Sequence, residues 1–189
     1  MSMPPLASVA QLAAYMQDTI SSADPSALLY LDLASGMVRD YLQQDLTPTP
    51  DDVVLLDPID GMCVLLPDLP VSDVSLVETL DQTAQTWSTV DPAMYTVARR
   101  TGIIAARPFT GVQWPADPES WRVTYSHGFA EVPDGIVGVV LGVAARAYAT
   151  DPGIESERIG GYQVKYNIGG GFNDLEQKAL NRYLVARVA

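Results

Sequence analysis

The chain has 189 residues, of which 48% are apolar and 18% are charged, so it can bury a core and does not have the composition of a disordered segment. Its 23 acidic and 11 basic residues give a net charge of −12, which excludes a protein that holds nucleic acid through a surface rich in Lys and Arg. One cysteine, Cys63, and one histidine, His127, exclude a disulfide framework and a Cys/His metal cage. We therefore expect no bound metal and no cofactor.

Two amphipathic helices are predicted in the first 46 residues. Apolar side chains recur at spacings of three and four over residues 6–20, where Ser8 and Gln11 have the spacing of a capping box. A second apolar stripe runs over residues 27–41 behind Asp24, whose side chain suits a helix N-cap. The short link between the stripes predicts that the two helices pack side by side and antiparallel.

Residues 47–130 predict a small antiparallel β subdomain. Short runs rich in Val, Ile, Tyr and Trp alternate with turn signals such as Asp60-Gly61 and the segment 100–102. Nine prolines between residues 48 and 118 leave no room for a long helix. The expected strands cover residues 53–56, 62–66, 71–78, 94–99, 102–106 and 121–126.

A third helix is predicted from Pro133, which suits a first helical turn, to the turn at residues 151–153. Its Gly138 and Gly142 have a G-x-x-x-G spacing, which we attribute to the close approach of a neighbouring backbone. The most apolar stretch of the chain lies in this helix and is too short to span a bilayer. We also expect no signal peptide, because no basic residue precedes the first apolar positions.

A glycine-bounded segment, residues 154–172, follows this helix and contains a predicted strand at 162–166. The last helix opens with an Asn173/Glu176 capping box and is expected to bury Leu175, Ala179, Leu180 and Tyr183. The order of elements predicts one α+β domain over residues 1–189. Its mainly helical core of about four helices comes from residues 1–46 and 131–189, with an inserted antiparallel β subdomain at 47–130 and an extended C-terminal arm.

No arrangement of residues points to catalysis. Asp57 and Asp60 could serve as paired carboxylates for acid–base chemistry, but the sequence DPIDG at 57–61 is typical of a turn. His127 accompanies no nucleophile-elbow pattern, and the glycine clusters of the chain match no phosphate-binding fingerprint. We expect no enzymatic activity, and a hydrolase that uses Asp57 and Asp60 is the open alternative.

The charge is unevenly distributed along the chain. Residues 1–98 hold 14 acids and one base, Arg39, whereas residues 99–189 hold 9 acids and 10 bases. A solvated surface that keeps the chain in solution accounts for such an excess. A sharper hypothesis is that the acids line a channel and repel DNA phosphates, so that a duplex slides through. The candidates for this acidic channel are Asp51, Asp52, Asp57, Asp60 and Asp68.

Several segments occur in an order that points to a known family. They are ASGMVR at 34–39, YSHGF at 125–129, EVPDGI at 131–136, ARAY at 145–148, GIESERIGGYQVKY at 153–166 and LNRY at 180–183. In these segments the sequence resembles the head-to-tail adaptor, or connector, proteins of tailed bacteriophages with long non-contractile tails (the siphophage type). The resemblance covers residues 1–46 and 121–189 and is weaker over 50–120, where this chain carries a large acidic insertion.

The resemblance implies a structural protein of the virion neck, without catalysis or a cofactor, that is made in the host cytoplasm and does not contact a membrane. Its partners would be the portal protein, neighbouring copies of itself in a twelve-fold ring, and the next head-completion protein on the tail side. DNA would pass through without specific binding. The residues expected to contact the portal and neighbouring subunits are Ile154, Arg158, Tyr162, Lys165, Tyr166, Lys178 and Arg182.

A second function class fits the residues without the resemblance. The β subdomain could be a small ligand- or receptor-binding module, and the adaptor reading does not require such a site. This alternative predicts a concave apolar patch around Trp87, Trp114 and Trp121.

Overall fold

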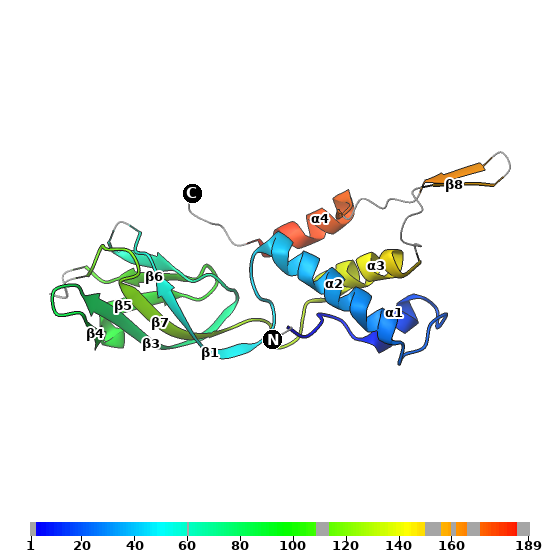
Figure 1. Cartoon of the computed structure of the whole chain (residues 1–189). Helices are drawn as coiled ribbons and strands as arrows, with labels where there is room; N and C mark the ends of the chain where they lie inside the picture. The colour runs from blue at the N-terminus through cyan, green and yellow to red at the C-terminus, as the bar shows by residue number, and fades with distance from the viewer. Residues whose placement is uncertain are drawn as a thin grey trace. The chain divides into compact units, whose positions relative to one another are not determined.

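The computed structural model describes residues 3–59, 61–108, 114–149, 156–159, 162–165 and 171–184. The chain consists of two compact units, which are described separately (Figure 1). The helical unit contains Met1–Gln43 and Val132–Leu184, and the β unit contains Gln44–Glu131. The predicted α+β class is confirmed. No helix among the described residues has the length and apolar character needed to cross a membrane.

The helical unit contains α1 (Val9–Tyr15), α2 (Pro25–Leu42), α3 (Asp134–Ala149) and α4 (Asp174–Leu180), the last followed by the 3-10 turn η2 (Asn181–Tyr183). The predicted helix starts are confirmed, with capping boxes at Ser8 and Asn173 and a side-chain cap from Asp24. The first helix is shorter than predicted because Gln17 and Asp18 adopt positive φ angles, which end the helical backbone.

Helix α3 is the centre of the helical unit, because it contacts α1, α2 and α4. Helices α2 and α3 pack against each other, and the fully buried apolar residues of the helical unit are Leu12, Ala27, Leu31, Val38, Ile136, Val140, Ala144 and Leu180. The stripe predicted for α4 is partly wrong. Leu175 is 76% exposed, and Glu176 is buried in its place because its carboxylate reaches Arg146 on α3.

The β unit contains two antiparallel sheets. The first has the strand order β1 (Thr49–Leu56), β7 (Trp121–His127), β3 (Val71–Asp81) and β4 (Thr86–Thr89). The second has the order β2 (Cys63–Leu65), β6 (Ile103–Ala106) and β5 (Tyr95–Ala98). A 3-10 turn, η1 (Pro92–Met94), precedes β5. The predicted turn at 100–102 joins β5 to β6, and an antiparallel bridge between Ile59 and Cys63 spans the predicted turn at 60–61, from which the chain enters the second sheet.

The β unit has a hydrophobic core of its own. Trp121, Val123 and Tyr125 point inward from alternate positions of β7, and Val64 and Ile104 meet them from the second sheet. Strands occupy about as much of the described chain as helices do. A mainly helical core is therefore not clearly shown, because strands and helices contribute about equally and the β unit buries a core of its own between two sheets.

Candidate functional site

The acidic channel candidates do not share one environment. Asp51 is exposed at a bulge of β1, where its N–H donates to the Ser126 hydroxyl at 3.1 Å. Asp57, just after β1, is exposed but accepts the Glu119 N–H at 2.7 Å. Asp52 and Asp68 are half-buried and belong to an internal cluster. Asp60 lies outside the described residues.

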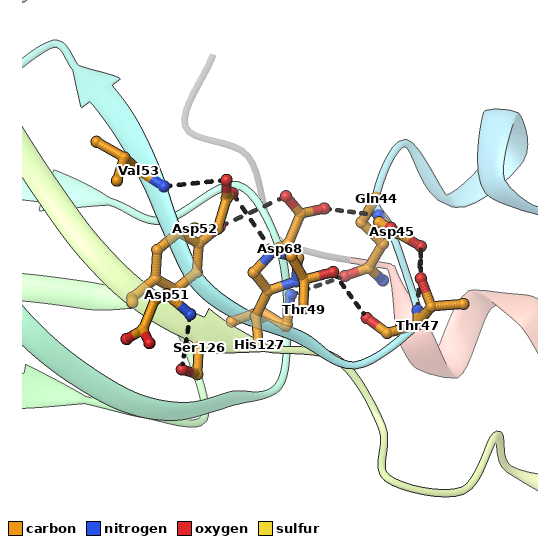
Figure 2. A network of polar contacts seen from close by, with 12 residues as sticks. Gln44, Asp45, Thr47, Thr49, Asp51, Asp52, Val53, Asp68, Ser126 and His127 are labelled. Carbon is orange, nitrogen blue, oxygen red and sulfur yellow. Dashed lines mark hydrogen bonds and ion pairs between the residues drawn. The ribbon is translucent and has the colours of Figure 1, made fainter. Parts of the chain in front are cut away.

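Asp52, Asp68 and His127 form a polar cluster at one end of the β unit (Figure 2). Asp68 accepts the Asp45 N–H at 2.6 Å and the Tyr125 hydroxyl at 3.4 Å. The Asp52 carboxylate lies 3.5 Å from Nε2 of His127, which is only 4% exposed and stacks on the Tyr125 ring at 4.9 Å. Burial, together with the nearby Asp68 carboxylate, raises the pKa of Tyr125 well above its usual value, so its hydroxyl stays a donor.

This polar cluster is the one group with metal-ligand composition among the residues that the structure describes, with ligand atoms within 4.8 Å of one another. Its carboxylates already accept fixed donors: Asp68 takes the two bonds above, and Asp52 takes the Val53 N–H at 3.0 Å. The cluster joins β1, the loop before β3 and the end of β7. We interpret it as a structural tie between these segments, because both carboxylates accept hydrogen bonds from the chain, although Nδ1 of the buried His127 has no hydrogen-bond partner among the described residues.

The three tryptophans do not form the open patch that the binding-module alternative predicts. Trp121 is fully buried and stacks on Trp114 at 4.8 Å with ring planes 16° apart. Trp87 instead lies under the guanidinium of Arg122, 4.4 Å from its ring centre. Arg122 also binds Glu78 through two bonds of 2.6 and 2.7 Å, which lower the pKa of that carboxyl. Trp121 is therefore a core residue, and Trp87 packs against a side chain of another strand in its own sheet.

The predicted arm contains a two-stranded antiparallel hairpin of β8 (Ser156–Ile159) and β9 (Tyr162–Lys165). Arg158 pairs with Gln163 and Ile159 with Tyr162, so three of the predicted interface residues lie on this hairpin. Ile154 and Tyr166 fall outside the described residues. Lys178 and Arg182 lie apart from the hairpin, exposed on α4 and η2.

Sequence reasoning overlooked an apolar surface on α2. Leu29 is 57% exposed and Leu33 is 56% exposed, one helical turn apart on the face opposite the buried stripe. A Cβ added at Gly36 on the same face would meet no atom within 4 Å. The signal was present in the sequence, because leucines at positions 29 and 33 lie outside the stripe of residues 27–41 and still repeat at helical spacing.

Glu176 and Arg146 form an ion pair in the helical unit through two hydrogen bonds. The bonds measure 2.6 and 3.0 Å, and Glu176, which is 9% exposed, also accepts the Asn173 N–H at 2.9 Å. Gly142 leaves room for the carboxylate, since a Cβ there would lie 3.3 Å from Oε1 of Glu176. Of the two glycines in the G-x-x-x-G spacing, only Gly142 has such a neighbour, because a Cβ at Gly138 would meet nothing within 4 Å.

This ion pair predicts acid sensitivity of the helical unit. Burial acts to raise the pKa of Glu176, but the bonds from Arg146 and the Asn173 N–H outweigh it and hold the pKa below its usual 4.5. The stabilisation is therefore present above about pH 4.5 and is lost as the pH falls through the lowered value. Glu176→Gln should lower the free energy of unfolding by about 1–2 kcal/mol at neutral pH. It should also reduce the fall of the helical unit's melting temperature below pH 4.5, which circular dichroism measures. The control is Glu131→Gln, an exposed carboxyl that should leave this fall unchanged.

Neither a protein-family model nor a curated protein matches the sequence. Solved structures with the same fold include a chain described as "Neck of empty GTA particle computed with C6 symmetry", which is 16% identical and has a TM-score of 0.60. The alignment covers 100% of this chain and 92% of that one. A second, "Neck of native GTA particle computed with C12 symmetry", is 17% identical, has a TM-score of 0.59 and aligns over 96% and 90%. The chain thus shares the fold of neck proteins from a phage-like particle, in agreement with the family resemblance of its sequence.

Proposed function

We propose that the chain is a structural head-to-tail adaptor of a phage-like particle. In this role it docks on the portal, joins the capsid to the tail and leaves a channel for DNA. The observation that carries the proposal is the likeness to a particle neck chain over the whole length, with both the helical and the β unit included in the alignment. Catalysis is not part of the proposed role.

The same likeness supports a ring of identical copies as part of the proposal. The neck structures were obtained with six-fold and twelve-fold symmetry, and closed cyclic symmetry requires that each copy contact two neighbours through complementary surfaces. We adopt the twelve-fold ring implied by the sequence resemblance. The ring would place acidic side chains toward the DNA path, and Asp51 and Asp57 are the described candidates whose side chains remain exposed.

The arm supplies the proposed contact with the portal. The β8–β9 hairpin carries Arg158, Tyr162 and Lys165, and charged and aromatic residues of this kind dominate interface energies. Ile154 and Tyr166 flank the hairpin in sequence and complete the candidate set. The tail-side protein would bind the opposite rim of the ring.

The experiment is assembly of the full-length chain with its portal complex, followed by mass measurement and electron microscopy. We expect a ring of twelve copies of the 20.3 kDa chain, about 244 kDa, added below the portal. A variant with Arg158→Glu and Lys165→Glu should reduce portal binding at least about tenfold, with the melting temperature unchanged. A chain that stays at 20.3 kDa in the presence of portal, with no density added at the neck, contradicts the proposed function.

A further inference from the structure

The exposed face of α2 combines apolar and acidic side chains in one row. Leu29, Leu33, Gly36 and Asp40 follow one another at steps of four, three and four residues, so they lie along one side of the helix, with Asp32 at its edge. We call these five residues the α2 face. Both leucines are more than half exposed, and neither aspartate has an ion-pair partner among the residues that the structure describes.

The exposed face of α4 and η2 has the complementary composition. Leu175, Lys178 and Arg182 follow at steps of three and four residues and are all exposed. We call these three residues the α4 face. Within the described part of the chain, Lys178 and Arg182 take part in no ion pair. The α2 face therefore offers leucines beside acidic side chains, and the α4 face offers a leucine beside two basic side chains and one acid, Asp174, so the charges of the two faces are mainly opposite in sign.

We propose that in the ring the α2 face of one copy binds the α4 face of the next copy. The inference rests on the proposed ring and names the surfaces that close it. Two different patches that meet head to tail generate a ring, whereas two α2 faces in contact would set aspartates against aspartates. Both faces belong to the helical unit, so one compact unit would present both halves of the contact.

Gly36 gives this interface a further argument and a test. Glycine inside a helix costs about 1 kcal/mol relative to alanine, and no described residue of its own chain requires it, since a Cβ there would enter open space. A missing side chain at the centre of the α2 face allows a neighbouring helix to approach closely. Gly36→Gln should thus leave the monomer as stable as before or more so, and should reduce ring formation at least about tenfold because the added side chain fills the contact.

Charge exchange tests the pairing itself. Asp32→Lys with Asp40→Lys should abolish rings on the portal, and Lys178→Glu with Arg182→Glu should do the same, because each places like charges in contact. The chain that carries all four substitutions should recover rings, since the opposite signs are restored. Recovery in the fourfold variant is a result that a merely destabilised monomer cannot give.

A covalent readout separates this proposal from the function on which it rests. In a chain with Cys63→Ser, the pair Leu33→Cys and Leu175→Cys should give an oxidised ladder of linked copies, whereas Leu33→Cys alone should stay unlinked because it faces no second cysteine across the proposed contact. Portal-bound rings without the ladder, with Gly36→Gln and the charge variants assembling normally, would overturn the interface and leave the adaptor function standing. Absence of any ring in the unaltered chain would overturn both.

Discussion

Gly128→Ala is expected to unfold the β unit. Gly128 follows β7 with φ of +89°, where side chains are disfavoured, and an added Cβ would overlap the backbone carbonyl of Thr47. The glycine N–H also donates to Pro70 O at 3.1 Å, and the next residue, Phe129, donates to Leu46 O at 3.0 Å. These bonds hold two loops that cannot withdraw without losing them. We expect a loss of about 3–5 kcal/mol in the free energy of unfolding.

Tryptophan fluorescence measures this loss selectively, because all three tryptophans lie in the β unit. The matched control is Gly138→Ala on α3, where a Cβ enters open space and should stabilise the chain by up to about 1 kcal/mol. Urea unfolding of both variants provides the comparison. If Gly128→Ala unfolds at the same urea concentration as the parent chain, the close approach of Thr47 to Gly128 is not present in solution.

Trp121→Ala should have a comparable effect through the core. Trp121 is fully buried between the two sheets, stacks on Trp114 and donates its indole N–H to Pro115 O at 3.3 Å. Its removal leaves a large cavity that neighbouring strands cannot close, with an expected cost of about 3–5 kcal/mol. The melting temperature, followed by circular dichroism, reports the loss.

Trp87→Ala is the matched control for this cavity. Trp87 is half-buried and contacts the guanidinium of Arg122, an interaction worth about 0.5–1 kcal/mol, so its removal should lower stability only slightly. The opposite ranking would contradict the assignment of Trp121 to the core. A Trp121→Ala chain that keeps its stability but loses a small ligand would revive the binding-module alternative.

Local signals were enough to predict the helix starts. The Ser8/Gln11 box, the Asp24 cap and the Asn173/Glu176 box each involve residues within three positions of one another, and all are present. The position of a helix end depended on backbone angles at Gln17 and Asp18 that composition does not reveal. Local chemistry therefore predicted where helices begin better than where they end.

Contacts distant in sequence account for what could not be predicted. Strand β4 has the sequence TWST, which lacks clear alternation, and forms because β3 pairs with it. Burial of Glu176 in place of Leu175 depends on Arg146, 30 residues away. The polar cluster joins residues 52, 68 and 127, so a charge count could identify Asp52 and Asp68 as acidic but could not show that they point inward.

The order of the two units along the chain has a consequence for biosynthesis. The described residues of the β unit form one continuous segment, whereas the helical unit needs α1 and α2 from one end of the chain and α3 and α4 from the other. A ribosome therefore releases both sheets of the β unit while α2 still lacks its central packing partner, α3. During that interval the apolar residues of α2 that later face α3 are exposed together with its outer leucines. Chaperone demand should peak then, and a translation pause placed after residue 131 would prolong it.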